Sequence, residues 1–167
     1  MAQANPERAL RERPPWKTVQ LGTHGSLDLL RQELIMAGCM IDDMANDMFN
    51  SIIFASQVVE IDLYWAGVTE LFDMGHNWRE IRSMLDHYGF GNCPQEVAPQ
   101  LRRQFLEQKI GESYWIVSRP IGSRLFSVSS ERNGLWLRGY EIDPQHRIAG
   151  DSKIVFCNKS QLAKIGP

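Results

Sequence analysis

The longest stretch of regularly spaced apolar residues runs from Ile41 to Met74. Its apolar side chains recur every three or four residues, at Ile41, Met44, Met48, Ile52, Ala55 and Val59. This spacing places them on one face of an α-helix. The pattern predicts a helical spine over residues 41–74, as one long helix or as two helices that meet near Gly67.

Three shorter segments also have helical signals. Ser26 is a favourable N-cap for a helix that ends at Ala37. Asn77 is a favourable N-cap for a helix from Trp78 to Tyr88. A last helix is predicted from about Pro99 to Lys109, because proline is tolerated in a first turn but breaks a helix interior. The first two thirds of the chain should therefore form four to five helices.

From Glu112 onward the apolar period changes to two, which is typical of strands. The runs are Ser113–Ser118, Arg124–Ser129, Leu135–Ile142 and Lys153–Cys157. Asn133-Gly134 is a preferred dipeptide for a two-residue hairpin loop, and Asp143-Pro144 opens the next turn. We expect an antiparallel meander of about four strands.

The hairpin predicts which side chains share a face. With Asn133 and Gly134 as the loop, Val128 lies opposite Gly139. One face then collects Phe126, Val128, Leu135 and Leu137. The other face collects Trp115, Trp136, Arg138 and Tyr140, which are residue types enriched at the centres of protein interfaces. These four are the candidate interface, unless another segment of the chain covers them.

The predicted fold class is α+β, with an N-terminal helical region followed by a C-terminal antiparallel β-meander. Residues 1–25 are rich in proline and glycine and are predicted to be an arm with one short extended piece at Lys17–Leu21. Residues 26–167 are predicted to form a single α+β domain. Its helical part is 26–111 and its β-meander is 112–167.

Composition narrows the class of protein. A hydrophobic fraction of 43% and a charged fraction of 23% are ordinary for soluble globular chains. No apolar run reaches the roughly 20 residues of a membrane span, and the N-terminus lacks the pattern of a secretory signal. Cys39, Cys93 and Cys157 are odd in number and widely spaced, which favours buried thiols and a cytoplasmic location.

Charge is unevenly distributed along the chain. Residues 26–108 hold thirteen acidic and five basic side chains, whereas both flanking regions are net basic. This asymmetry is explained either by charge matching within or between subunits, or by an acidic surface offered to a basic partner. It argues against nucleic acid as the partner of the helical part.

No motif for catalysis or for a cofactor is found. Asp43, Asn46, Asp47 and Asn50 would share one helical face and offer oxygen ligands to magnesium, but carboxylates at a helix start are also favoured by the helix dipole. The four histidines are far apart and show no metal-binding spacing. The sequence therefore predicts no catalytic residues, no metal and no cofactor.

Residues 68–105 have the order of elements of a helix-turn-helix unit. Arg102 and Arg103 are its candidate nucleic-acid contacts. Pro99 would interrupt a recognition helix begun at Pro94, and the region is acidic where DNA binding needs positive charge. Ordinary helix packing is the favoured interpretation.

Three functions follow from this reading. The first is a non-catalytic protein-interaction module, as a homo-oligomer, that uses the aromatic sheet face or the acidic helices. The second is a DNA-binding regulator that uses residues 68–105. The third is a small ligand-binding protein or enzyme with a site between helices and sheet.

Overall fold

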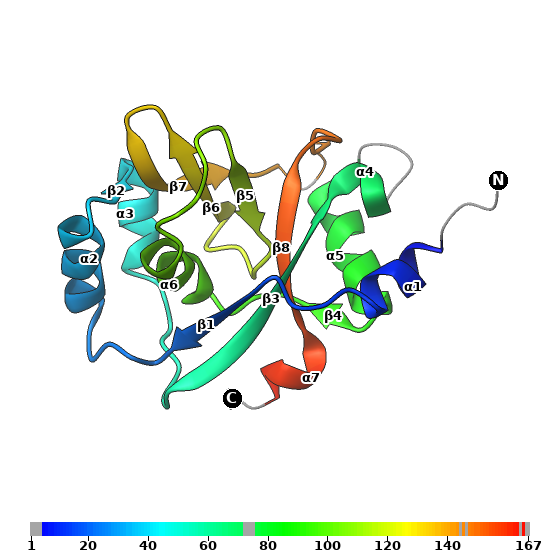
Figure 1. Ribbon diagram of the computed structural model, residues 1–167, viewed down its shortest axis with the longest axis horizontal. Coiled ribbons are helices and arrows are strands. Elements are labelled where there is room, and N and C mark those ends of the chain that lie inside the picture. Colours follow the sequence, from blue (N-terminus) through cyan, green and yellow to red (C-terminus); the bar gives the residue numbers. More distant parts are fainter. Residues whose placement is uncertain (1–4, 72–75, 144, 146, 164, 166–167) are drawn as a thin grey trace.

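Helices and strands are interspersed along the chain in the computed structural model, which describes residues 5–71, 76–143, 145, 147–163 and 165 (Figure 1). The helices are α1 Pro6–Arg11, α2 Leu27–Met36, α3 Asp43–Phe49, α4 Val68–Leu71, α5 Trp78–His87, α6 Val97–Gln104 and α7 Lys159–Leu162. The strands are β1 Lys17–Leu21, β2 Met40–Ile41, β3 Val59–Gly67, β4 Phe90–Gly91, β5 Ser113–Ile116, β6 Arg124–Glu131, β7 Gly134–Glu141 and β8 Lys153–Asn158.

All these strands join one mixed sheet. Its order is β1-β3-β8-β5-β6-β7-β2, and β4 pairs with β8 off this path. The β5–β8 and β2–β7 pairs are parallel and the other pairs are antiparallel. Strands from the N-terminal, middle and C-terminal parts of the chain therefore lie side by side, so the sheet needs most of the chain to form.

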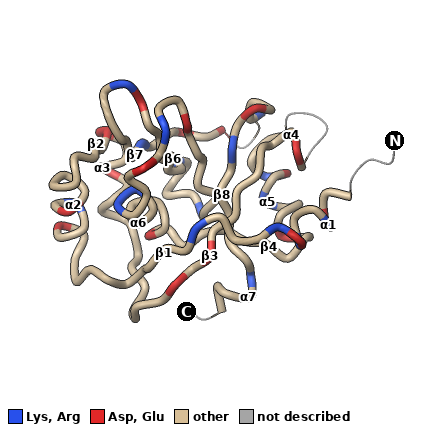
Figure 2. The backbone as a smooth tube through the Cα atoms, viewed as in Figure 1, with Lys and Arg blue, Asp and Glu red and all other residues tan. Residues whose placement is uncertain are grey.

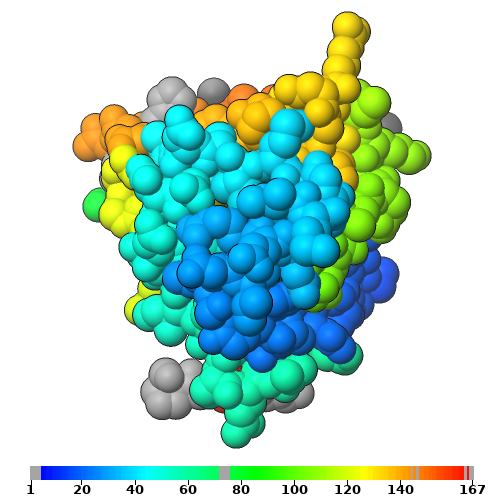
Figure 3. All heavy atoms as spheres, turned by 90° about the vertical axis from the view of Figure 1, so that its left-hand side faces the viewer, coloured from blue at the N-terminus to red at the C-terminus, as the bar shows by residue number. Residues whose placement is uncertain are grey.

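The sheet separates two apolar clusters. The first lies under α2, α3 and α6 and includes Leu30, Met48 and Leu101. The second lies under α1, α4 and α5 and includes Trp78 and Ile81. Figure 1 shows the two groups of helices on opposite sides of the sheet, and Figure 3 shows α2 and α3 covering one end of the molecule. Helices therefore bury both faces of the central strands.

The predicted α+β order, with helices first and an antiparallel meander after them, is wrong. The fold is mixed α/β, because β1, β2, β3 and β4 all precede the C-terminal strands and join the same sheet. The meander prediction holds for β5, β6 and β7 but fails at β8, which crosses back to lie parallel to β5, with Trp115 opposite Ile154. β8 there fills the gap between β5 and β3 and completes the centre of the sheet.

The predicted helical spine over 41–74 is also wrong. Its first part contains the short helix α3, whose Ala45 and Met48 are buried, but residues 59–67 form β3. The burial of Ile61 and Leu63 follows a period of two, as in a strand. The three-to-four spacing that ends at Val59 runs from α3 across the following loop, so it does not mark one continuous helix. Residues 72–74 of the spine lie outside the described part of the chain.

Several local predictions are confirmed. Ser26 caps α2 by accepting a hydrogen bond from the Leu29 amide. Asn77 and Glu80 form a capping box at the start of α5. The short extended piece predicted at Lys17–Leu21 is β1, which pairs with β3 along its length. These signals depend on neighbouring residues alone, which is why they survive the error in the overall fold.

The β6–β7 hairpin has the predicted faces but a different register. Glu131 pairs with Gly134, so Arg132 and Asn133 form the loop and Val128 lies opposite Leu137. The predicted loop would need Asn133 at positive φ, yet only Gly134 has one, at 135°. The register shift is two residues, an even number, and each side chain stays on its predicted face. The predicted next turn, at Asp143-Pro144, includes Pro144, which lies outside the described residues.

Candidate functional site

The four candidate interface residues share one face of the sheet, which we call the platform. The platform consists of Trp115, Trp136, Arg138 and Tyr140. Ser127 on β6 pairs with Trp115 on the neighbouring strand β5 and with Arg138 on the neighbouring strand β7. Ser129 pairs with Trp136 in the same way. Ser127 is 1% exposed and Ser129 is 5% exposed, so the larger side chains lie over both small serines. The platform therefore has a floor of small residues and a surface of aromatic rings and one guanidinium.

Ring contacts join the platform to the second cluster. The Trp115 ring lies 4.8 Å from the Tyr140 ring and 5.6 Å from that of Trp78 in α5, measured between centroids. α5 therefore covers one end of this sheet face. Tyr140, which contacts Trp115 on the edge-ward strand β7, is 40% exposed. Burial raises the pKa of the Tyr140 hydroxyl, so it remains a neutral hydrogen-bond donor at physiological pH.

Arg138 is fixed by neighbours on three sides. Its Nε and Nη2 donate to the two oxygens of Glu131 at 2.7 and 2.9 Å, and Asp42 lies 3.8 Å from Nη1. The guanidinium stacks 4.0 Å from the Trp136 ring centroid. The hydrogen bond from Arg138 lowers the pKa of Glu131, and the same contact raises that of Arg138. The two groups hold each other ionised and oriented at neutral pH.

Arg102, one of the two candidate nucleic-acid contacts, lies in the interior. It is 0% exposed. Its Nη1 donates to Gln108 at 2.6 Å and to the Ser129 carbonyl at 3.0 Å, and Nη2 donates to the Phe105 carbonyl. The side chain thus links the end of α6 to β6. A guanidinium in this position reaches no phosphate, so this residue is a structural one.

The helices of the proposed helix-turn-helix do not pack as a pair. α5 belongs to the second apolar cluster and α6 to the first, and β4 lies between them in the chain. Figure 1 shows them on opposite sides of the sheet. Arg103 is partly exposed, but it donates to Gln100 and lies 3.6 Å from Glu33. Figure 2 shows acidic and basic residues interspersed along the elements.

Two of the residues considered for magnesium contact arginines: Asp47 lies 4.0 Å from Arg124, and Asn50 accepts a hydrogen bond from Arg31 at 3.4 Å. Their neighbour Asp42 caps α3 by accepting from the Ala45 amide at 2.8 Å, and it also accepts from the Gly139 amide at 3.1 Å. Within the described ranges, no group of three histidine, cysteine or acidic residues is arranged to hold a metal ion. In the same part of the chain, no helix is both long enough and apolar enough to cross a membrane.

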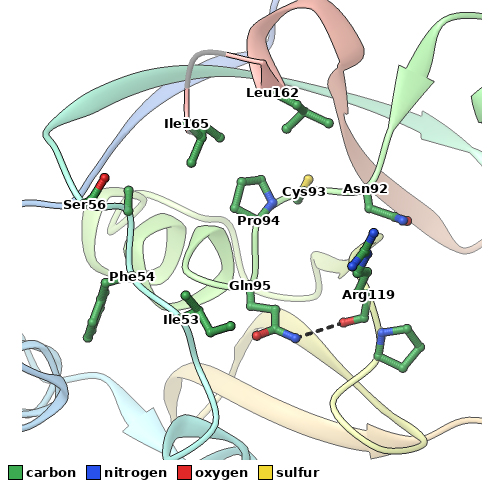
Figure 4. A pocket seen from close by; sticks show the side chains of 12 residues that line it. Ile53, Phe54, Ser56, Asn92, Cys93, Pro94, Gln95, Arg119, Leu162 and Ile165 are labelled. Carbon is green, nitrogen blue, oxygen red and sulfur yellow. Dashed lines mark hydrogen bonds between the residues drawn. The ribbon is translucent and has the colours of Figure 1, made fainter. Parts of the chain in front are cut away.

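A cavity of about 520 Å³, which we call the loop pocket, opens where four segments meet (Figure 4). Its lining residues are Ile53, Phe54, Ala55, Ser56, Asn92, Cys93, Pro94, Gln95, Arg119, Pro120, Leu162 and Ile165. None of them is acidic, and Arg119 is the one cation among them. No local sequence pattern predicts this pocket, because its residues come from loops that meet only through the order of the strands in the sheet.

The wall of the loop pocket contains one of a pair of buried thiols. Cys93 lines the cavity, and the Cys157 thiol donates to the Cys93 sulfur at 3.0 Å. Cys93 in turn donates to the Val155 carbonyl. Burial raises the pKa of Cys157 well above its ordinary value. All three cysteines are free and buried, which confirms the prediction of buried thiols.

Comparison with known proteins gives no assignment. No protein-family model matches the chain. No curated protein matches it. No solved structure matches it either. Any function must therefore be inferred from the two surfaces described above, the platform and the loop pocket.

Proposed function

We propose that the protein is a non-catalytic interaction module that binds a second copy of itself through the platform. The observation that carries this proposal is the fixed Arg138 guanidinium, held by Glu131 and stacked on Trp136 beside the exposed Tyr140. Tryptophan, tyrosine and arginine contribute most to binding energy when they are held rigid before a partner arrives. A side chain already ordered loses little entropy on binding.

The charges of the platform favour a second copy over a strongly charged partner. The exposed part carries both Arg138 and the Glu131 carboxylate, so neither sign is in large excess. In a two-fold symmetric interface the same patch occurs on both subunits, and it must complement itself. A patch that holds both signs beside aromatic rings meets that requirement.

The sheet edges do not offer an equivalent surface. At β1, the Gln104 side chain donates to the Gln20 carbonyl and accepts from the Gln20 amide. At the opposite end, the two-residue strand β2 covers part of β7, and next to it Asp42 accepts from the Gly139 amide while its own amide donates to the Leu137 carbonyl. These contacts cap backbone groups that would otherwise pair with another strand. Association through the sheet face is therefore favoured over strand addition.

The same proposal includes a cytoplasmic location, which the three free, buried thiols support. Thiols in oxidising compartments are usually paired as disulfides, whereas reduced cysteines are typical of the cytosol.

The test is the molecular mass in solution, measured by analytical ultracentrifugation from about 5 to 200 µM. We expect the wild type to form a dimer, and we expect Tyr140→Glu to be monomeric because it buries an unpaired carboxylate at the contact. Met36→Glu is the matched control, since Met36 is 86% exposed on α2, on the other side of the sheet. This variant should remain dimeric.

Two results would overturn the proposal. One is a wild-type protein that stays monomeric over the whole concentration range. The other is a dimer that Tyr140→Glu leaves intact while the variant is folded by circular dichroism. Trp136→Ala provides a second variant, and it should weaken the dimer at least tenfold, as expected for loss of a central aromatic contact worth about 2 kcal/mol.

A further inference from the structure

The polar end of the loop pocket carries two side chains with unused hydrogen-bonding capacity. Arg119 is exposed, and within the described part of the chain its guanidinium has no ion-pair partner. The Asn92 amide likewise makes no hydrogen bond to a described residue. Figure 4 shows the two side chains close together at one end of the pocket. Their donors therefore face the same space.

Among the described residues that line the pocket, none carries a carboxylate that could compete for these donors. The nearest acidic residue in sequence is Glu96, which is fully buried and accepts from the Gly22 and Ala55 amides at 2.7 and 2.8 Å. Gln95, the other polar residue on this side, donates to the Arg119 carbonyl at 3.5 Å. The Arg119 guanidinium is thus the one charged group among the described residues that line the pocket.

The rest of the pocket is apolar. Pro94, Leu162 and Ile165 line it from one side and Ile53 from another (Figure 4). Ile53 is 80% exposed, so its apolar side chain is open to contact with a ligand. A ligand that lay along these residues would remove apolar surface from water.

We propose that the loop pocket binds a small amphiphilic oxyanion, with its carboxylate or phosphate on Arg119 and Asn92 and its apolar body against Ile53, Pro94 and Leu162. A planar guanidinium matches both oxyanions in geometry. The volume of about 520 Å³ suits a small molecule. A neutral ligand would leave Arg119 unused, and a bare inorganic anion would leave the apolar walls uncovered.

The test is a titration of the full chain followed by ¹H–¹⁵N correlation spectra, with octanoate, octyl phosphate and 1-octanol as probes below their aggregation concentrations. We expect saturable shifts confined to residues around the pocket. At least one of the two anions should bind about fivefold more tightly than the alcohol, as expected for one partly exposed charge contact. The preferred anion identifies the head group.

Two pairs of variants separate the pocket from general surface binding. Arg119→Gln should weaken binding of the preferred anion about fivefold and leave 1-octanol unchanged, whereas Arg132→Gln, at the exposed hairpin loop, should change neither. Ile53→Asp should weaken the anion at least tenfold, because it adds a repelling carboxylate and removes apolar contact. Ile35→Asp, at a position 61% exposed on α2, is its control.

The proposal is overturned if neither anion gives saturable shifts, if 1-octanol binds as tightly as both anions, or if Arg119→Gln and Arg132→Gln have the same effect. Equal loss in Ile53→Asp and Ile35→Asp would also contradict it. All four substituted side chains are exposed, so each variant should fold, and the same spectra verify this. The titration does not depend on whether the platform forms a dimer.

Discussion

Arg102 and Arg103 are neighbours of the same residue type with opposite environments. Arg102 is fully buried and its two Nη groups donate to Gln108 and to backbone carbonyls, whereas Arg103 is partly exposed near Glu33. On a helix, adjacent residues point about 100° apart, so one faces the core while the next faces solvent. Residue type alone could not tell which of the two was structural.

The first prediction compares these two arginines. Arg102→Ala should lower the free energy of unfolding by about 3 kcal/mol or more, because it leaves buried acceptors without donors and opens a cavity. Arg103→Ala should cost about 0.5 kcal/mol, the usual range for an exposed ion pair. Urea denaturation measures both. Similar losses in the two variants would contradict the structural role of Arg102.

The second prediction concerns the thiols. Burial raises the pKa of Cys39 and, more strongly, that of Cys157, and the thiolate is the reactive form. At pH 8 an aromatic disulfide reagent should therefore label the native protein slowly, and it should label all three cysteines at once in urea. Release of the coloured thiolate measures the rate. Rapid labelling of the folded chain would show that these sulfurs are accessible.

At the scale of elements, α5 shows how a local signal becomes a testable pH effect. His76 and Glu80 hydrogen bond at 2.6 Å, and Glu80 also accepts from the Asn77 amide. The contact with His76 is the main cause of a lowered pKa for Glu80. A carboxylate with a lowered folded-state pKa stabilises the fold above its unfolded pKa, and this contribution is lost as pH falls through the folded value.

The third prediction follows from the lowered pKa of Glu80. Glu80→Gln should be less stable than the wild type at pH 7, and the difference should disappear between about pH 5 and pH 3 as the wild-type carboxylate is protonated. Asn77→Ala is the control: it removes the cap itself and should lower the free energy of unfolding by about 1 kcal/mol at pH 7 and at pH 3 alike. Thermal unfolding across this range measures the difference. A pH-independent effect of Glu80→Gln would be inconsistent with the shifted pKa.

The elements also show how far sequence reasoning reaches. α2, α5 and strands β5 to β7 follow from caps, glycines and alternation, which act within a few residues. β3 was missed although Ile61 and Leu63 alternate with Glu60 and Asp62, because the preceding helical spacing ran into it. Its pairing with β1 and β8 depends on contacts distant in sequence, which no local pattern encodes.

The platform and the loop pocket also differ in whether local sequence patterns can predict them. The platform could be predicted because side chains two residues apart on a strand share a face, and a register error of two residues leaves that face unchanged. The loop pocket could not be predicted, since Ile53, Asn92 and Arg119 come from three connections. Nothing in the sequence near Arg119 shows that its guanidinium has no ion-pair partner in the described part of the chain.

At the scale of the whole molecule, residues 5–21 are part of the folded body. Leu10 of α1 is 1% exposed within the second cluster, and Val19 and Leu21 of β1 are buried in the first. Arg13 donates to the Trp65 carbonyl at 2.6 Å, so the chain between α1 and β1 also contacts β3. The segment predicted as an arm therefore contributes to both sides of the sheet.

The fourth prediction separates those two contributions by truncation. Removing residues 1–12 deletes α1 and should cost about 2–4 kcal/mol, chiefly through the loss of the buried Leu10. Removing residues 1–22 also deletes β1, which exposes the edge of β3 and the apolar groups beneath it, so this form should aggregate or lose cooperative unfolding. Leu10→Ala in the full chain is the control, and it should reproduce most of the first loss. Circular dichroism during urea denaturation measures all three forms. If the form without residues 1–22 unfolds at the wild-type midpoint, β1 is dispensable.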